Sequence, residues 1–304
     1  MKKLPKVERH IHFEGSLFSL TGKRKVNSFS KFLEVFKEIC FKIKSEKDFL
    51  FLGDEFFSYL KDENIVYAEF FLSLPVWMKF GFDIFKILEN INLSGEKYTN
   101  FLKYGIVIDG VRQFHPAYMY KLVFNMEKFK ELNVVGFGMG GNENCCNLDR
   151  FYDFFQIARR KGFLINVHIG EVVRGRKAFY DLFLVRPDRV GHLLDVNLFN
   201  DFIVENNVVV DFLISSNLKT GVVEKGETHP SLYVGEYVNF LINSDDPAIF
   251  NTTLTREYEI YLDEGGDPVK LAKNLMREIK NISAFSEDKK RNYLKEIVTF
   301  FNLE

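Results

Sequence analysis

Four short segments of the sequence carry side chains that can bind a metal ion. His10 and His12 stand two residues apart, His168 and His192 each lie in a short apolar run, and Asp245-Asp246-Pro247 follows another. Residues i and i+2 of a β-strand point to the same face, so His10 and His12 can reach one point. Neutral imidazole and carboxylate groups bind Zn²⁺ and similar transition metals. The set therefore predicts a metal site with nitrogen and oxygen ligands and room for a water molecule.

Each of these features alone also has a structural explanation. Two histidines near a terminus can be partly exposed, a histidine at a strand end can be a hydrogen-bonded core residue, and Asp-Asp-Pro can be a turn that starts a helix. Glu171 follows His168 by three residues, past a glycine. It can cap a surface helix or act as an acid and base above a pocket. The choice depends on the elements that bring these segments together.

Eight apolar runs rich in Val, Ile and Phe supply those elements, and amphipathic segments separate them. This alternation is typical of βα units with a parallel sheet. The predicted strands are Val7–Phe13, Ile65–Leu72, Gly105–Val111, Val134–Gly138, Leu164–His168, Arg189–Leu193, Val208–Ile214 and Val238–Asn243. The candidate ligands fall on or next to the first, fifth, sixth and eighth strands. The ends of these strands share one pocket if the strands close into a barrel.

Helices are predicted between and after the strands. They are Pro116–Leu132, Asp149–Lys161, Asn197–Asn206, two helices within Ser28–Leu60, and a helical chain after Pro247 with start signals at Asp267-Pro268 and Ser286-Glu287-Asp288. We therefore expect one domain over residues 1–304. Its α/β fold is a (β/α)₈ TIM-type barrel with extra helices after strand one and at the C-terminus. An open, doubly wound sheet is the alternative.

Composition excludes several classes of protein. The 304 residues are 46% hydrophobic with a net charge of −1, which argues against disorder and against duplex binding. The sequence has no run long enough for a membrane span, no signal-peptide pattern, and only three cysteines. We expect a cytoplasmic protein that binds neither nucleic acid nor membrane, with monomer or homo-oligomer left open. The 34 phenylalanines predict a core built from large rings.

Several motifs carry less information. Gly136–Gly141 matches G-x-G-x-x-G, but no helix opens at once after it, so a ligand close to the backbone fits better than a dinucleotide. His12-Phe13-Glu14 matches half of the cytidine deaminase zinc motif, whose P-C-x-x-C half is missing. Cys145-Cys146 is interpreted as packing or incidental. His115 and His229, each followed by proline, are interpreted as loop or helix-start residues, although His229 could line the pocket mouth.

Together, the motifs resemble the adenosine deaminase family of amidohydrolase-type metal barrels. The resemblance runs from Lys6 to about Phe250. The segments that carry it are Pro5–Leu17, Val134–Glu143, Val167–Glu171, Arg189–His192, Ser216–Gly221 and Asn243–Pro247. By position, the resemblance implies one Zn²⁺ per chain, or another divalent transition metal, with His10, His12, His168 and Asp245 as ligands. It also places His12 beside the substrate.

The same resemblance implies roles around a purine ring. Glu171 matches the acid that protonates purine N1, and His192 matches the residue that orients and deprotonates the zinc-bound water. Asp246 matches the partner of purine N7, and Gly141 matches the glycine whose N–H meets purine N3. Glu14 occupies the acidic position near the sugar. Together these residues imply a substrate site that holds both base and sugar.

The implied activity is zinc-dependent hydrolytic deamination of a 6-aminopurine nucleoside, adenosine or a 5′-modified adenosine, to the hypoxanthine product and ammonia. This is a hydrolase acting on C–N bonds of cyclic amidines. The chemistry agrees, because a metal ion lowers the pKa of its water to about 7 and a buried carboxyl group can deliver a proton. The alternatives are another hydrolase on the same barrel, either an adenine deaminase or a non-purine amidohydrolase. A non-catalytic relative would be expected to have lost Glu171 or a ligand.

The sequence departs from the family away from the metal set. Leu193 replaces a usual glycine, Phe71 replaces an arginine common in adenosine deaminases, and Gly138 replaces an aspartate. These departures leave the exact nucleoside open.

Three segments look more like the branch that deaminates aminodeoxyfutalosine, whose 5′ extension carries a benzoate. They are Tyr67–Glu69 with Ser73 and Trp77, Asp109–Phe114 and Gly136–Gly141. In that branch Arg112 or Arg174 could pair with the carboxylate of the substrate. Both could instead form structural salt bridges.

Overall fold

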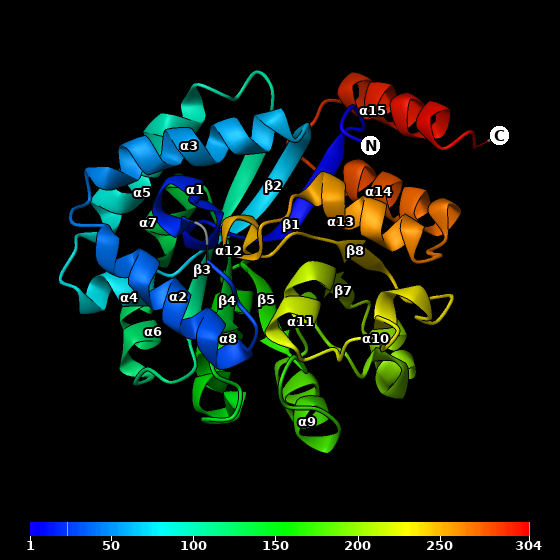
Figure 1. Cartoon of the computed structure of the whole chain (residues 1–304). Coiled ribbons are helices and arrows are strands. Elements are labelled where there is room, and N and C mark those ends of the chain that lie inside the picture. Colours follow the sequence, from blue (N-terminus) through cyan, green and yellow to red (C-terminus); the bar gives the residue numbers. More distant parts are fainter. Residues whose placement is uncertain (23, 304) are drawn as a thin grey trace.

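Eight parallel strands form the centre of the computed structural model, which describes residues 1–22 and 24–303 (Figure 1). They are β1 Lys6–His12, β2 Ile65–Leu72, β3 Lys103–Val111, β4 Val134–Gly140, β5 Leu164–Ile169, β6 Arg189–His192, β7 Val209–Phe212 and β8 Phe240–Ile242. Each strand pairs with the next one in chain order. All eight predicted strands are confirmed, with boundaries shifted by two residues at most.

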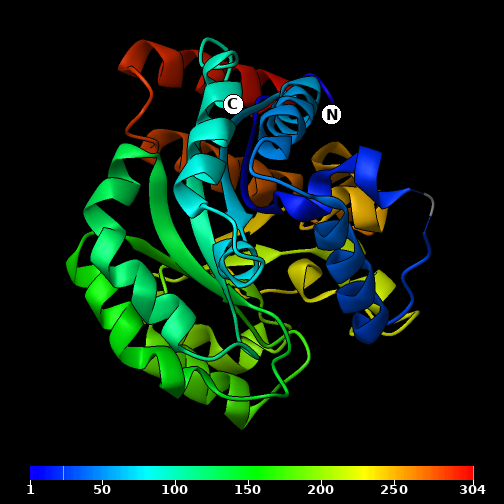
Figure 2. The same cartoon turned by 90° about the vertical axis from the view of Figure 1, so that its left-hand side faces the viewer.

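The sheet closes between β8 and β1. Asp245, just after β8, forms a parallel bridge with Ile11. Its N–H donates to the carbonyl of His10 at 3.1 Å, and its carbonyl accepts the N–H of His12 at 2.8 Å. Helices alternate with the strands and surround them (Figure 2). The fold is therefore the predicted TIM-type barrel, and the open sheet is excluded.

Fifteen α-helices and five short 3₁₀ helices are present in the described residues. The α-helices are α1 Phe18–Thr21, α2 Phe29–Lys42, α3 Asp48–Asp62, α4 Leu74–Lys79, α5 Ile84–Glu96, α6 Ala117–Leu122, α7 Met126–Glu131, α8 Tyr152–Arg160, α9 Arg176–Val185, α10 Asn200–Glu205, α11 Ile214–Thr220, α12 Pro247–Phe250, α13 Leu254–Asp263, α14 Pro268–Asn281 and α15 Glu287–Phe300. The 3₁₀ helices are η1 Glu14–Ser16, η2 Val123–Asn125, η3 Leu148–Phe151, η4 Val196–Phe199 and η5 Pro230–Leu232. Within residues 1–22 and 24–303, no helix has the length and apolarity needed to cross a membrane.

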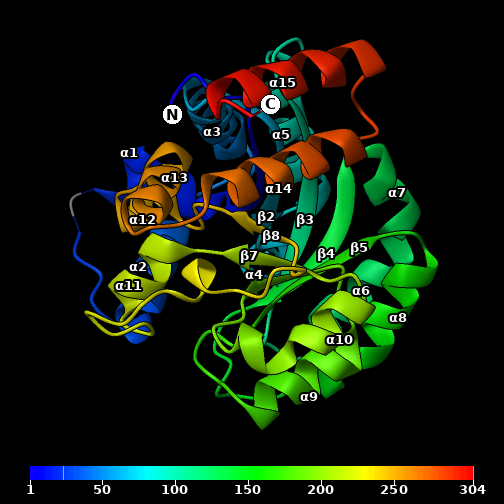
Figure 3. The ribbon, with the colours of Figure 1, turned by 90° about the vertical axis from the view of Figure 1, so that its right-hand side faces the viewer.

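The extra helices lie where the sequence predicts them. α2 and α3 occupy the first connection, and α13, α14 and α15 follow β8. Figure 3 shows α14 and α15 side by side, with both chain ends near them. The start signals act as expected, because Asp267 accepts the N–H groups of Val269 and Lys270 and the Ser286 hydroxyl accepts that of Lys289.

One segment predicted as a single helix is interrupted in the structure. The segment Pro116–Leu132 is two α-helices, α6 and α7, joined by the 3₁₀ turn Val123–Asn125. Valine and asparagine are weak helix formers, and the Phe124 ring between them is exposed, so packing does not compensate for their low propensity. The helices predicted at Asp149–Lys161 and Asn197–Asn206 also begin with 3₁₀ turns.

Phenylalanine rings attach the first helices to the barrel wall. Phe13, which follows β1, packs on Phe49 and Phe56 of α3 and on Phe70 of β2. Phe49 meets Trp77 of α4 edge-on at 5.0 Å. All five side chains are fully buried, and each such ring contributes about 1.5–3 kcal/mol of hydrophobic stabilisation. This cluster fixes the position at which β1 ends.

Buried ions join the barrel to α14. Glu278 of α14 pairs with Arg9 at 2.7 Å and with Arg189 at 3.4 Å. Arg9 also binds Glu69, and Arg189 binds Asp211. Neighbouring guanidinium groups lower the pKa of Glu278 despite the opposing effect of burial. Because these charges are buried, removal of Glu278 would take one ion pair from each arginine, although Glu69 and Asp211 would remain as their partners.

We expect Glu278→Ala to lower the free energy of unfolding by about 1.5–3 kcal/mol, because two buried guanidinium groups each lose one of their two carboxylate partners. Urea denaturation followed by circular dichroism measures this. The matched control is Glu287→Ala in α15, whose exposed pair with Lys290 contributes little to stability. Equal urea midpoints for the two variants would contradict the proposed importance of the buried network.

Candidate metal centre and active-site cavity

Four predicted metal ligands converge at the carboxyl ends of the strands. His10 and His12 come from β1, His168 from β5, and Asp245 from the turn after β8. The Nε2 atom of His168 lies 3.0 Å from that of His10 and 3.1 Å from that of His12. Asp245 Oδ1 is 3.5 Å from His10 Nε2 and 3.4 Å from His12 Nε2. The closing turn of the barrel thus also carries a candidate ligand.

These donors fit a transition-metal ion. Nitrogen and oxygen ligands about 2.0–2.1 Å from a tetrahedral Zn²⁺ lie about 3.3–3.4 Å from one another, close to the spacings observed here. All four side chains are buried, and the set offers three imidazole nitrogens and a carboxylate. Such a buried His/Asp cluster is typical of a metal site. That these four residues are the ligands stays a prediction.

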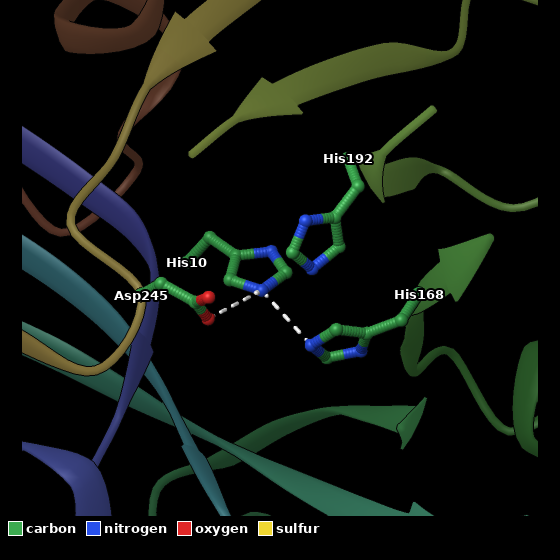
Figure 4. A group of neighbouring side chains, drawn as sticks. All are labelled: His10, His168, His192 and Asp245. Atoms are coloured by element: carbon green, nitrogen blue, oxygen red, sulfur yellow. Dashed lines mark hydrogen bonds and ion pairs between the residues drawn. The ribbon is translucent and has the colours of Figure 1, made fainter. Parts of the chain in front are cut away.

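His192 of β6 also belongs to the cluster. One donor atom from each of His10, His168, His192 and Asp245 lies within 4.8 Å of the others, and Figure 4 shows these side chains pointing toward one another. A second, overlapping group contains His12, Asp245 and Asp246. The structure therefore brings together all four predicted ligands and two of the three predicted catalytic residues, His192 and Asp246.

A buried carboxylate supports His10 from behind. Asp211 Oδ2 of β7 lies 3.7 Å from His10 Nδ1, while Arg189 and Asn243 hold Asp211. Burial of His10 opposes its positive charge, but Asp211 and Asp245 outweigh it and raise the pKa of His10 to about 9. A carboxylate behind the imidazole leaves the far nitrogen, Nε2, turned toward the cluster.

The turns that present these groups adopt unusual backbone angles. His192, Leu193 and Asp245 have φ values of 68°, 38° and 64°, in the left-handed region that side chains disfavour. Leu193 adopts this conformation where the resembling family has glycine. Each such residue costs about 1–3 kcal/mol, so the surrounding packing must hold these turns in place.

Glu171 lies on a short loop beside His192. Its Oε2 is 3.6 Å from His192 Nε2. The Glu143 carboxylate holds this loop, because it accepts the backbone N–H groups of Gly170, Val172 and Val173 at 2.7–2.8 Å. Burial raises the pKa of Glu171 well above its ordinary value, and the charges of Asp245 and Glu143 raise it further. The protonated form of Glu171 is therefore favoured.

Asp246 faces the same space from the other side. Both carboxyl oxygens are buried without a hydrogen-bond partner among the described residues. Burial and the charge of Asp245 raise the pKa of Asp246 well above its ordinary value. A Cβ atom at Gly15 would overlap Asp246 Oδ1, so only glycine lets the carboxyl group take this position. Asp246 can therefore offer a hydrogen bond to a ligand.

A cavity of about 500 Å³ opens beside this cluster. Its inner wall contains His12, His168, Glu171, His192, Asp245, Asp246 and Gly141. Its mouth is largely aromatic, formed by Phe29, Phe32, Phe36, Phe41, Phe80 and Phe114, with two lysines, Lys37 and Lys79. Most of these mouth residues come from α2, which therefore forms one wall of the entrance. The mixture of an apolar mouth and a few convergent polar groups is typical of a ligand site.

Glu14 and Gly141 differ in their relation to this cavity. Gly141 has φ of 90°, and a side chain there would overlap Gln113. Glu14 is fully buried, and its Oε1 accepts the N–H groups of Ser73 and the Trp77 indole at 3.0 and 2.9 Å. Burial raises the pKa of Glu14 to about 7. Glu14 is not among the cavity-lining residues of the described chain, so a sugar contact stays a prediction.

Sequence reasoning missed Asp109 as a site residue. This carboxyl group of β3 is buried, lines the cavity, and leaves Oδ1 without a partner in the described chain. Burial raises its pKa well above the ordinary value. The available signal was a single aspartate near the end of an apolar strand. A Cβ at Gly138 would lie 3.1 Å from Asp109 Oδ1. The Asp109 carboxyl group therefore lies next to Gly138, the position at which the resembling family has an aspartate.

Arg112 is one of two arginines that could pair with a substrate carboxylate, and the structure favours the alternative of a structural salt bridge. Its guanidinium is buried and binds Asp181 at 2.7 Å and the carbonyl of His168 at 2.7 Å. The guanidinium of Arg174 donates to the carbonyl of Val222. Neither arginine is among the described residues that line the cavity. The structural alternative therefore holds for Arg112, which forms a buried salt bridge with Asp181, whereas Arg174 contacts only a backbone carbonyl among the described residues.

The family model described as adenosine deaminase matches residues 16–300. An adenine deaminase of Agrobacterium fabrum is 26% identical over 290 residues, covering 86% of this chain and 88% of that protein. An adenosine deaminase of Clostridium botulinum is 24% identical over 331 residues, covering 97% and 98%. Neither relative is an aminodeoxyfutalosine deaminase, so this comparison gives that branch no support.

Solved structures share the fold. The adenine deaminase of Arthrobacter aurescens has a TM-score of 0.85 at 17% identity, covering 98% of this chain and 99% of that one. A Burkholderia ambifaria amidohydrolase with bound Zn has a TM-score of 0.80 at 18% identity, covering 99% and 91%. At these identities the likeness establishes the barrel.

We expect His10→Ala to lose its metal, because the substitution removes the candidate imidazole ligand that Asp211 supports from behind. Elemental analysis of the purified protein should show about one divalent metal ion per wild-type chain and much less in the variant. His115→Ala, an exposed histidine, is the matched control. Full metal retention in folded His10→Ala protein would remove His10 from the ligand set.

Proposed function

Because the chain belongs to the adenosine deaminase family of metal-dependent hydrolases, we propose that it deaminates a 6-aminopurine nucleoside to the hypoxanthine product and ammonia. The observation that carries this proposal is the placement of one buried carboxyl group, Glu171, between the metal cluster and a cavity of about 500 Å³. Hydrolysis of an aromatic amine needs both an activated water and a proton for the ring. The site offers groups for both tasks.

His10, His12, His168 and Asp245 would hold the ion, with Zn²⁺ as the best fit to their donor set. When bound there, the ion supplies an activated water at neutral pH. The chain does the rest. It excludes bulk water with the aromatic mouth and presents a proton donor to one side of the ring. His192, whose Nε2 faces Glu171, orients the attacking water.

Glu171 and Asp246 would form hydrogen bonds with the nitrogen atoms of the purine ring. A protonated Glu171 donates to ring N1, so negative charge does not build up in the ring while the water attacks C6. A protonated Asp246 donates to N7, and the Gly141 backbone meets N3. Burial raises the pKa of both carboxyl groups well above the ordinary value, which favours the protonated forms that can face ring nitrogens able only to accept.

The substrate is proposed to be a nucleoside because the cavity continues past the polar cluster to α2. A free base would fill the inner part and leave the phenyl-lined mouth empty. A second candidate, adenine itself, is favoured by the relative named adenine deaminase at 26% identity. Both candidates share the same reacting atoms and differ in the group attached to N9.

We expect Glu171→Gln to keep its metal and fold but to lose about 10²–10⁴-fold in kcat, because an amide cannot supply the N1 proton. Steady-state kinetics and elemental analysis measure the two effects. Glu205→Gln, an exposed glutamate of α10, is the control. Turnover near the wild-type rate in Glu171→Gln would eliminate the acid role.

An ultraviolet absorbance assay distinguishes the substrates. Adenosine, methylthioadenosine, aminodeoxyfutalosine and adenine would be compared, each with and without a chelator. We expect a chelator-sensitive change that is faster with a nucleoside than with adenine. Faster turnover of adenine would replace the nucleoside proposal with the free-base alternative.

A further inference from the structure

A line of hydrogen bonds leads from His192 away from the cavity. Asn217 of α11 places Nδ2 2.8 Å from His192 Nδ1 and Oδ1 3.1 Å from His229 Nε2. His229 caps η5, because its Nδ1 accepts the backbone N–H of Ser231 at 3.2 Å. The side chains of His192, Asn217 and His229 are all buried. The proposed mechanism uses only the first of them.

A backbone group fixes the direction of every bond in this line. The Ser231 N–H can only donate, so His229 Nδ1 accepts it, and the Ser231 hydroxyl, 2.9 Å from the same nitrogen, then also donates to it. The single proton of a neutral imidazole therefore lies on Nε2. Burial lowers the pKa of His229 to about 3, which keeps the ring neutral. His229 Nε2–H then donates to Asn217 Oδ1. The Asn217 amide must therefore donate through Nδ2 to His192 Nδ1.

We propose that Asn217 and His229 are positioning residues that hold His192 in the tautomer with its proton on Nε2. This inference rests on the proposed function, in which Nε2 of His192 meets the attacking water. A nitrogen that already carries a proton donates a hydrogen bond and accepts none. His192 therefore orients the water as a donor. The role of proton acceptor, which the family resemblance implies, requires the other tautomer.

The tautomer can be observed directly without a substrate. Long-range ¹H–¹⁵N correlations on metal-loaded protein labelled with ¹⁵N-histidine distinguish protonated from bare ring nitrogens. The signals of His192 are those that disappear in His192→Gln. We expect a bare Nδ1 and a protonated Nε2 on both His192 and His229. A protonated Nδ1 on wild-type His192 would overturn the proposal.

Asn217→Asp reverses the polarity at one atom while keeping the shape. A carboxylate still accepts from His229 but cannot donate to His192, so Nδ1 of His192 gains a proton. We expect kcat to fall about tenfold or more while KM and metal content change little. Wild-type kcat in this variant would contradict the proposal.

Variants of His229 separate the hydrogen-bond line from simple helix capping. A glutamine there can accept from Ser231 and donate to Asn217, whereas leucine can do neither. We expect His229→Leu to lower kcat and His229→Gln to restore a large part of it. His115→Leu is the matched control, because His115 also precedes a proline and accepts the N–H of Ala117 at 3.2 Å, but on the surface.

Equal loss of kcat in His229→Gln and His229→Leu would also contradict the proposal. If a variant fails to fold, the wild-type spectrum still decides the tautomer. If the enzyme turns over no purine, the proposed function is wrong and the kcat values of the variants cannot be compared. The spectrum then tests the hydrogen-bond line by itself.

Discussion

Three imidazole nitrogens and one carboxylate oxygen share a small buried volume, with separations of 3.0–3.5 Å between neighbouring atoms. Bare imidazole nitrogens present lone pairs to one another at such distances, so a proton or a cation must lie between them. Much of the nearby structure serves this convergence. Asp211 and Arg189 support one imidazole from behind, and left-handed turns at His192 and Asp245 redirect the chain where strands end. The barrel is the scaffold that makes this geometry possible.

Around that cluster the cavity divides into two chemical halves. Glu171, Asp246 and Asp109 form a half in which burial favours neutral carboxyl groups that can donate hydrogen bonds. The opposite half is built from phenyl rings of α2 and its neighbours. A flat heteroaromatic ring with acceptor nitrogens matches the first half, and a less polar extension matches the second. The two halves therefore suit different parts of one ligand.

Periodicity was sufficient for the strands, because a barrel strand is buried on both faces and reads as a continuous apolar run. The positions of the candidate ligands followed from the same pattern, since His168 and Asp245 stand where two runs stop. Contacts between side chains from distant segments could not be predicted from hydrophobic periodicity. Nothing in the local sequence indicates that Arg112 is occupied by Asp181, that Asp109 reaches the cavity, or that His229 lies behind Asn217. These facts depend on how loops from different units meet, and the family resemblance gave roles to some residues without their surroundings.

Asp245 takes part both in the closure of the barrel and in the candidate metal cluster. Its backbone closes the seam between the last strand and the first, while its carboxylate belongs to the candidate metal cluster. An ion bound to that carboxylate also restrains the peptide groups that close the seam. Metal loading is then a late step of folding, because the ligands from β1 and β8 meet only once the ring is complete. In the metal-free state, amide hydrogens at this seam would therefore exchange with solvent faster than in the metal-loaded state, so exchange in the first and last strands would report metal occupancy.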